Sequence, residues 1–242
     1  MTIEIIAECG INHRGDMKLA REMIDIAKSI NIKIVKFQLY DVDALFPDKQ
    51  IIAQNRNWYE EVKKTQLTKE QVFELAGYCR EVGIEFFASA FDLERLSWLE
   101  EVGVKRHKIA TRMNQTEKYI IAVRKLGKPI IFSTNLPRTQ ISFWYNTLYC
   151  IPKYPAQLSD LEFNKIKFMN TRKYANNYTF DGFSDHTIGP EASMIAMARG
   201  ATIIEKHFCL KRDNSNPDMV CSIEPNELKE LVEFARKVEE VL

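Results

Sequence analysis

Residues 3–37, IEIIAECGINHRGDMKLAREMIDIAKSINIKIVKF, carry the pattern that decides the fold. The runs 3–7 and 33–37 are rich in β-branched residues and have the continuous apolar character of strands buried on both faces of a parallel sheet. Between them, apolar side chains recur every three or four residues from Leu19 to Ile30, which places them on one face of a helix. This stretch therefore predicts a strand–helix–strand unit.

The unit repeats along the whole chain. The expected strands are 3–7, 33–37, 84–88, 106–110, 129–133, 147–151, 179–183 and 201–206. Eight units in 242 residues correspond to about 30 residues each, a usual size for such a repeat. The pattern predicts an α/β fold, a closed (β/α)8 TIM barrel formed as one domain over residues 1–242. An open doubly wound sheet is the alternative, although no Gly-x-Gly-x-x-Gly dinucleotide-binding motif follows the first strand.

Local signals refine this prediction. Thr68 followed by Gln71 predicts a capping box at the start of a helix. Two connections are long, 41–68 and 209–224, and each is either a lid over a binding site or a surface excursion. The first contains NWYEE, which favours a short helix.

Composition excludes several classes of protein. The chain has 34 Lys and Arg against 33 Asp and Glu, a net charge of +1, which is unlike a strongly basic nucleic-acid-binding protein. It has no apolar run long enough for a transmembrane helix, and its start lacks the features of a signal peptide. Five cysteines without a Cys-x-x-Cys motif indicate reduced thiols, and we expect a cytoplasmic protein.

Polar residues cluster where the expected strands end. In a closed barrel these ends converge on the face that carries active sites. The strand-end residues are Glu8, Lys36, Gln38, Ser89, Lys108, Thr111, Ser133, Thr134, Cys150, Ser184, Asp185, His186, Glu205, Lys206 and His207. Lysines and hydroxyls suit an anionic, oxygen-rich ligand, and Lys36, Lys108 and Lys206 are expected at one mouth. The alternative is a ring of residues that only solvates the rim.

The four histidines differ in position. His186 and His207 end neighbouring strands, so together with oxygen ligands they are candidates to bind Mn²⁺, Fe²⁺, Co²⁺ or Zn²⁺. Two hydrogen-bonded core histidines are the alternative. His13 lies in the first strand–helix loop, where it is a candidate to touch a ligand. His107 precedes Lys108 and is expected on the opposite side of its strand, in a structural role.

Several motifs resemble the sialic acid synthase family. They are AECGINHRGD (7–16), VKFQ (35–38), KIAT (108–111), GKPIIFST (127–134), YCIPKYP (149–155), FSDHTIG (183–189), IIEKHF (203–208) and NPDMVCSIEP (216–225). Members of this family have a barrel catalytic domain. They condense phosphoenolpyruvate with an N-acetylated aldose to give a nonulosonic acid and phosphate.

The resemblance implies roles for individual residues. His186 and His207 correspond to the ligands of a divalent metal, usually Mn²⁺, with Mg²⁺ or Co²⁺ as alternatives. The catalytic candidates are Glu8, Lys36, Lys108 and Asp218, and the substrate-binding candidates are Gln38, Ser89, Thr111, Arg112, Ser133, Tyr154 and Ser184. The metal is expected to polarise the aldehyde of the sugar, with Glu8 or Asp218 as proton carrier.

The sequence also departs from the family pattern. Arg112-Met113 replaces the usual Gly-Glu, so the acceptor sugar stays open, and Arg112 either meets an acidic or phosphorylated sugar or faces solvent. Pro152 stands at a position that is usually small and polar, and Asn135-Leu136 follows Ser133-Thr134 where the family has Gly-Met. The C-terminal antifreeze-like domain of the family is not in the chain, so we expect a homodimer or a separate antifreeze-like partner protein. The functional alternatives are a different acceptor and a non-catalytic ligand-binding barrel.

Overall fold

Eight parallel strands close into a barrel in a computed structural model that describes residues 2–136, 145–168 and 178–241. Around the barrel the order is β1 (Glu4–Gly10), β12 (Ile203–His207), β11 (Gly182–Asp185), β8 (Asn146–Cys150), β7 (Ile130–Thr134), β6 (His107–Ile109), β5 (Glu85–Ala90) and β2 (Ile34–Leu39). The first strand pairs with β2 on one side and with β12 on the other, which closes the sheet. The closed barrel is therefore confirmed, and the open doubly wound sheet is wrong.

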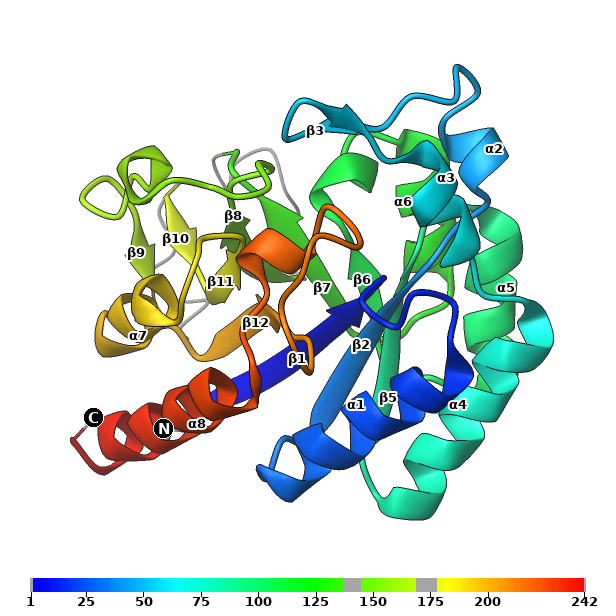
Figure 1. The fold of residues 1–242 in the computed structure, drawn as a ribbon. Coiled ribbons are helices and arrows are strands. Elements are labelled where there is room, and N and C mark those ends of the chain that lie inside the picture. Colours follow the sequence, from blue (N-terminus) through cyan, green and yellow to red (C-terminus); the bar gives the residue numbers. More distant parts are fainter. Residues whose placement is uncertain (1, 137–144, 169–177, 242) are drawn as a thin grey trace.

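Helices cover the outside of the barrel (Figure 1). They are α1 (Met17–Ser29), α4 (Lys69–Val82), α5 (Leu93–Val102), α6 (Glu117–Lys125), α7 (Glu191–Ala198) and α8 (Pro225–Val241). The predicted capping box is present at α4, where the Thr68 hydroxyl accepts from the Gln71 N–H and the Gln71 side chain accepts from the Thr68 N–H. No described helix is long and apolar enough to cross a membrane. All five cysteines are free and buried.

Two apolar layers hold the strands in place. Inside the barrel, one side chain from each of several strands forms a plug: Ile6, Ile34, Phe87, Ile131, Leu148 and Ile203. A larger cluster fills the space between the strands and the helices. Gly182 permits the close approach of β11 to β12, because a Cβ atom there would overlap the carbonyl oxygen of Ile203. The plug fills the interior below the polar strand ends, so those ends form the floor of a site rather than a channel.

The connection after β2 has structure of its own and lies beyond the strand ends (Figure 1). It contains α2 (Val42–Leu45), the hairpin β3 (Ile52–Ala53) and β4 (Arg56–Asn57), and α3 (Tyr59–Lys64). The helix predicted from NWYEE is therefore present as α3. The second long connection contains a 3₁₀ turn, η5 (Met219–Cys221), and the Gln54 side chain donates to the Pro217 carbonyl at 3.2 Å. The two long connections thus contact each other.

The expected seventh strand, 179–183, is divided. Its first part, β10 (Thr179–Phe180), pairs with β9 (Lys167–Phe168) in a small separate sheet, while the barrel strand begins at Gly182 and continues to Asp185. The apolar run continues across both parts, so hydrophobicity alone does not mark the change of partner. Two 3₁₀ turns complete the described elements, η1 (Thr111–Met113) after β6 and η3 (Leu158–Asp160) after β8.

Candidate active site

A cavity of about 800 Å³ opens at the carboxyl ends of the barrel strands. It is lined by every residue predicted to act in catalysis, substrate binding or metal binding: Glu8, Lys36, Gln38, Ser89, Lys108, Thr111, Arg112, Ser133, Tyr154, Ser184, His186, His207 and Asp218. The structure brings these side chains together, and their individual roles stay predictions. The connection after β2 supplies part of the wall through Leu45, Phe46 and 50–53, so it is both a folded excursion and a cover.

Alternating charges form the floor of the cavity. Lys36 Nζ lies 2.5 Å from Glu8 Oε2 and 3.7 Å from Glu205 Oε1, and it donates to Ser89 at 3.1 Å. Lys108 Nζ lies 3.0 Å from the same Glu205 oxygen, which also accepts from the Ser184 hydroxyl at 3.0 Å. All of these side chains are buried. Glu205 was not among the predicted site residues, although its two-residue spacing from His207 already places both on one face of β12.

The charges of the floor set its protonation. Burial alone would raise the pKa of Glu205, but Lys108 and Lys36 lower it to about 2, so Glu205 is ionised. Burial alone would lower the pKa of Lys36, yet Glu205 and Glu8 raise it. Burial lowers the pKa of Lys108, against the opposing pull of Glu205. Burial raises the pKa of Glu8 despite Lys36, which makes Glu8 the floor carboxyl that takes up a proton more readily.

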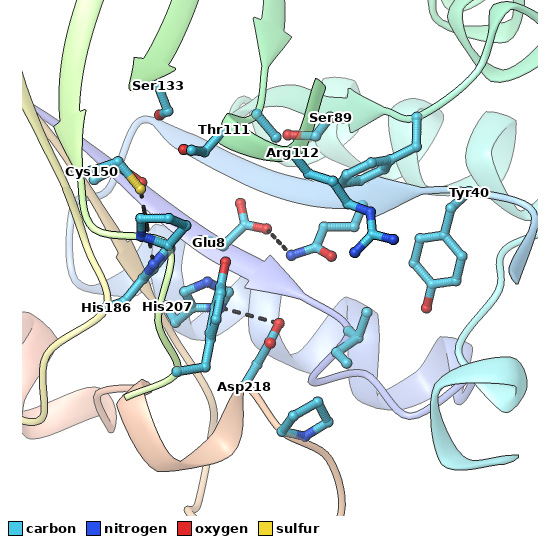
Figure 2. A pocket seen from close by; sticks show the side chains of 18 of the residues that line it. Glu8, Tyr40, Ser89, Thr111, Arg112, Ser133, Cys150, His186, His207 and Asp218 are labelled. Carbon is cyan, nitrogen blue, oxygen red and sulfur yellow. Dashed lines mark hydrogen bonds and ion pairs between the residues drawn. The ribbon is translucent and has the colours of Figure 1, made fainter. Parts of the chain in front are cut away.

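His186 and His207 lie close together in the cavity (Figure 2), with ring centroids 5.5 Å apart and ring planes tilted by 57°. His186 Nδ1 lies 2.8 Å from the Ile151 carbonyl, an arrangement that assigns the proton to Nδ1 and leaves Nε2 as a lone-pair donor. Burial, His186 and the nearby lysines hold the pKa of His207 well below its usual value, so its imidazole is neutral. Tyr154 stacks on His186 at 4.1 Å between ring centroids.

The donor set fits a divalent cation with an open coordination sphere. His207 is a neutral imidazole, and its Nδ1 and Asp218 Oδ2, which lie 3.4 Å apart, make no hydrogen bond to another described residue. Burial alone would lower the pKa of His186, but Cys150 and the Ile151 carbonyl raise it, so a cation would have to displace a proton from this ring more often than from His207. Among the described residues, no three His, Cys, Asp or Glu side chains gather closely enough to hold a metal by themselves. A cation here would therefore be held by His186 and His207 together with water or substrate oxygens.

Asp218 lies beside this pair, with Oδ2 3.4 Å from His207 Nδ1 (Figure 2). Burial and the neighbouring Glu8 raise its pKa to about 7. Gln38 Nε2 donates to Glu8 at 3.3 Å, which holds the second carboxyl toward the same space. Two carboxyl groups with raised pKa values therefore border the cavity, as proton transfer near neutral pH requires.

Two further strand-end residues, Lys206 and Cys150, lie on opposite sides of the cavity lining. Lys206, expected at the mouth, is fully buried outside the cavity lining, 3.2 Å from Asp185 Oδ2, and that expectation is wrong. The reason is strand alternation, because its neighbours Glu205 and His207 face inward. Cys150, which follows Tyr149 at the end of β8, does line the cavity, with Sγ 3.9 Å from His186 Nδ1.

The two other histidines lie outside the cavity lining. His107 is buried with Nε2 2.9 Å from Glu100, in agreement with its expected structural role. His13 is buried, accepts a hydrogen bond from the Gly15 N–H at 3.1 Å and packs on Phe37. His13 therefore does not reach the cavity, because the first turn of the loop folds it against the barrel wall.

A closed (β/α)8 barrel with lysines, hydroxyls and paired histidines gathered in a cavity at its strand ends has the architecture of a barrel enzyme whose cavity suits an anionic ligand. Comparison with known sequences makes this specific. The chain belongs to the NeuB family, whose family model matches residues 23–242.

Relatives and solved structures agree with this assignment. The chain is 32% identical to the N,N'-diacetyllegionaminic acid synthase of Legionella pneumophila, covering 100% of this chain and 74% of that protein. It is 31% identical to the human N-acetylneuraminate-9-phosphate synthase, covering 98% of this chain and 70% of that protein. The crystal structure of N-acetylneuraminic acid synthetase from Leptospira borgpetersenii, in complex with citrate, superposes with a TM-score of 0.86 at 29% identity, over 100% of this chain and 85% of that one.

Proposed function

We propose that this protein is a metal-dependent synthase that condenses phosphoenolpyruvate with an aldose to give a nonulosonic acid and inorganic phosphate. The observation that carries the proposal is that the buried lysine–glutamate floor and two neighbouring imidazoles, with ring centroids 5.5 Å apart, line the same cavity. The names of the relatives as nonulosonic acid synthases support the same reaction class.

The floor and the adjacent wall suit phosphoenolpyruvate. Lys36 and Lys108 supply positive charge to its carboxylate and phosphate. The buried hydroxyl of Ser133 lines the cavity and has no hydrogen-bond partner among the described residues, so it is free to donate to a ligand, while the Thr111 hydroxyl lies at the same wall beside the Cys150 thiol. An unpaired buried hydroxyl is costly, and an anionic ligand would satisfy it.

His186 and His207 are the proposed ligands of a divalent cation, for which we propose Mn²⁺ with Mg²⁺ or Co²⁺ as alternatives. When bound, the cation supplies Lewis acidity to the aldehyde oxygen of the sugar. The neutral state of His207 leaves its ring ready to coordinate, and the Nδ1 hydrogen bond of His186 to the Ile151 carbonyl orients Nε2 of that ring as the second ligand atom.

The proposed reaction balances through one water molecule. Carbon 3 of phosphoenolpyruvate forms a bond to the aldehyde carbon, and the hydroxyl of water adds to carbon 2. The proton that water loses passes to the former aldehyde oxygen, with Asp218 or Glu8 as its carrier. Cleavage of the bond between carbon 2 and the phosphate oxygen then releases phosphate together with the hydroxyl proton, leaving a ketone.

Phosphate release tests the proposal. The wild-type protein should release phosphate only when phosphoenolpyruvate, Mn²⁺ and an aldose are all present. His186→Ala and His207→Ala should abolish both release and Mn²⁺ binding measured by electron paramagnetic resonance, whereas His107→Asn, outside the cavity, should retain both. Unchanged release in either alanine variant contradicts the metal assignment. Binding of phosphoenolpyruvate without turnover across an aldose panel would instead favour a non-catalytic barrel.

A further inference from the structure

Arg112 is fixed at the cavity wall by the connection that follows β2. Its guanidinium lies over the Phe46 ring, 4.3 Å from the centroid, and Nη2 donates to the Leu45 carbonyl at 3.3 Å. Its side chain lines the cavity while remaining exposed to it. Figure 2 shows the guanidinium directed into the space between Glu8 and Tyr40. Arg112 therefore belongs to the wall of the cavity, where its side chain is exposed.

The charge of Arg112 has no protein partner. It forms no ion pair with a carboxylate of the described residues, and the segments 137–144 and 169–177 contain no Asp or Glu. Lys36 and Lys108, in contrast, each contact a glutamate within 3.0 Å. A guanidinium has five N–H donors, and the structure gives Arg112 one hydrogen-bond acceptor. Partial desolvation lowers its pKa, as expected for a cation with no anion beside it.

The position of Arg112 decides which part of a ligand it meets. If phosphoenolpyruvate occupies the lysine floor and the aldehyde lies at the histidines, both are held by strand-end residues of the barrel. Arg112 instead contacts Leu45 and Phe46, which belong to the cover formed by the connection after β2. The group that reaches this part of the wall is therefore the end of the aldose remote from its aldehyde.

We propose that Arg112 binds an anionic substituent, a phosphate or a carboxylate, at the end of the aldose remote from its aldehyde. This inference rests on the proposed function and names the acceptor class: an acidic aldose in place of a neutral one. A guanidinium pairs with two oxygens of either group at once, which makes the contact directional as well as charged.

Acceptor kinetics test this inference. The probes are N-acetylmannosamine, its 6-phosphate and its 6-carboxylate, each with saturating phosphoenolpyruvate and Mn²⁺. Arg112→Gln should lower kcat/KM for the preferred anionic acceptor by about 10- to 100-fold, mainly through KM, while changing the neutral acceptor by less than about threefold. Arg112→Lys should restore part of the loss for the phosphate and less for the carboxylate, since only the guanidinium pairs bidentately. The response to the two acidic probes distinguishes the phosphate from the carboxylate.

Arg56→Gln is the matched control. Arg56 lies in the same connection and also stacks on an aromatic ring, Trp58, at 4.1 Å, but it is paired with Glu61 and lies outside the cavity lining. It should leave the ratio of anionic to neutral kcat/KM unchanged. Equal loss of both acceptors in Arg112→Gln, or no preference for either anionic acceptor in the wild type, overturns the inference.

Binding of non-reacting analogues separates this inference from the proposed function. The alditols of N-acetylmannosamine and its two acidic derivatives lack the aldehyde and cannot react. Calorimetry should show tighter binding of an acidic alditol than of the neutral one, and about 10- to 100-fold weaker binding of that acidic alditol to Arg112→Gln. This result supports the subsite even if no aldose supports phosphate release, whereas equal binding of all three alditols overturns it.

Discussion

Glu205 lies between the two floor lysines, so one carboxylate oxygen balances two buried cations. It is 3.0 Å from Lys108 and 3.7 Å from Lys36. A buried charge is tolerated only where opposite charges and hydrogen bonds surround it. Removing one partner leaves the remaining buried charges uncompensated, which destabilises the folded protein. The lysine positions available to an anionic ligand therefore depend on Glu205.

Glu205→Gln should lower the free energy of unfolding by about 3 kcal/mol, because it leaves Lys36 and Lys108 with one carboxylate fewer. Urea denaturation measures the change. Glu101→Gln is the control, since Glu101 also pairs with a lysine, Lys69, but its side chain is 48% exposed. The control should lose less than about 1 kcal/mol, and equal losses in the two variants would contradict a special role for the buried network.

His13 should make stability depend on pH. Burial lowers its pKa from 6.5 to about 4, so the folded protein holds the imidazole neutral while the unfolded chain protonates it. The neutral imidazole contributes fully to the free energy of unfolding above pH 6.5. This contribution, about 3 kcal/mol, is lost as the pH falls from 6.5 toward 4. In His13→Asn the decline between these pH values should be shallower by that amount, measured by urea denaturation at each pH. Parallel curves for the two proteins would exclude this assignment.

At the residue scale, strand periodicity predicted most of the site and left out what depends on a partner from elsewhere in the chain. Lys36 and Gln38 lie in the cavity because their two-residue spacing fixes a shared face. The same rule gives Glu205 and His207 a shared face of β12, and it places Lys206, which lies between them, behind the wall rather than at the expected mouth. The position of Arg112 depends on Phe46, far away in sequence, so the motif around Arg112 left its orientation open.

The start of α4 shows how an element is set by its own sequence. The Thr68 hydroxyl accepts from the Gln71 N–H, and the Gln71 side chain accepts from Thr68 in return. Thr68→Ala should lower the free energy of unfolding by about 1 kcal/mol, measured by urea denaturation. Thr116→Ala is the control, because Thr116 precedes α6 without a side-chain capping hydrogen bond. A comparable loss in both variants would show that capping does not account for the effect.

Elements that depend on a remote partner were harder to predict. The capping box of α4 is complete within four residues, so the sequence revealed it. The division of 179–183 into β10 and β11 instead depends on pairing with β9, for which the run itself holds no signal. A local pattern therefore predicted the existence of the strand and missed the change of partner within it.

The end of the barrel opposite the cavity carries an ion-pair cluster that has no part in the site. Away from the cavity, the Arg106 guanidinium contacts Glu4 at 2.6 Å and Glu85 at 2.8 Å, which links β1, β5 and the start of β6. The Arg106 contacts therefore hold strands together at the end of the barrel opposite the cavity, as is usual for this architecture. The repeated strand–helix period was enough to predict the closed sheet, since the period reflects the entire chain rather than any one contact.

Arg106→Met should lower the free energy of unfolding by about 2 kcal/mol, because it leaves the partly buried carboxylates of Glu4 and Glu85 without their cation. The value of kcat for phosphate release should stay within about twofold, because these residues lie far from the cavity. Lys105→Met is the matched control, since Lys105 is 79% exposed with its nearest carboxylate at 4.0 Å. Urea denaturation and phosphate release, measured well below the unfolding temperature, check both parts. A large loss of kcat in the folded Arg106 variant would contradict the placement of Arg106 outside the site.

Strand β12 alternates between the two faces of the barrel wall, with Glu205 and His207 inside and Lys206 outside. A deletion or insertion of a single residue before Glu205 would exchange these faces. Lys206 would then point into the cavity, and Glu205 and His207 would point toward the apolar cluster between the strands and the helices. The length of this strand is therefore intolerant of single-residue gaps. The connection at 41–68 projects beyond the strand ends, so changes of length there leave the register of every barrel strand intact.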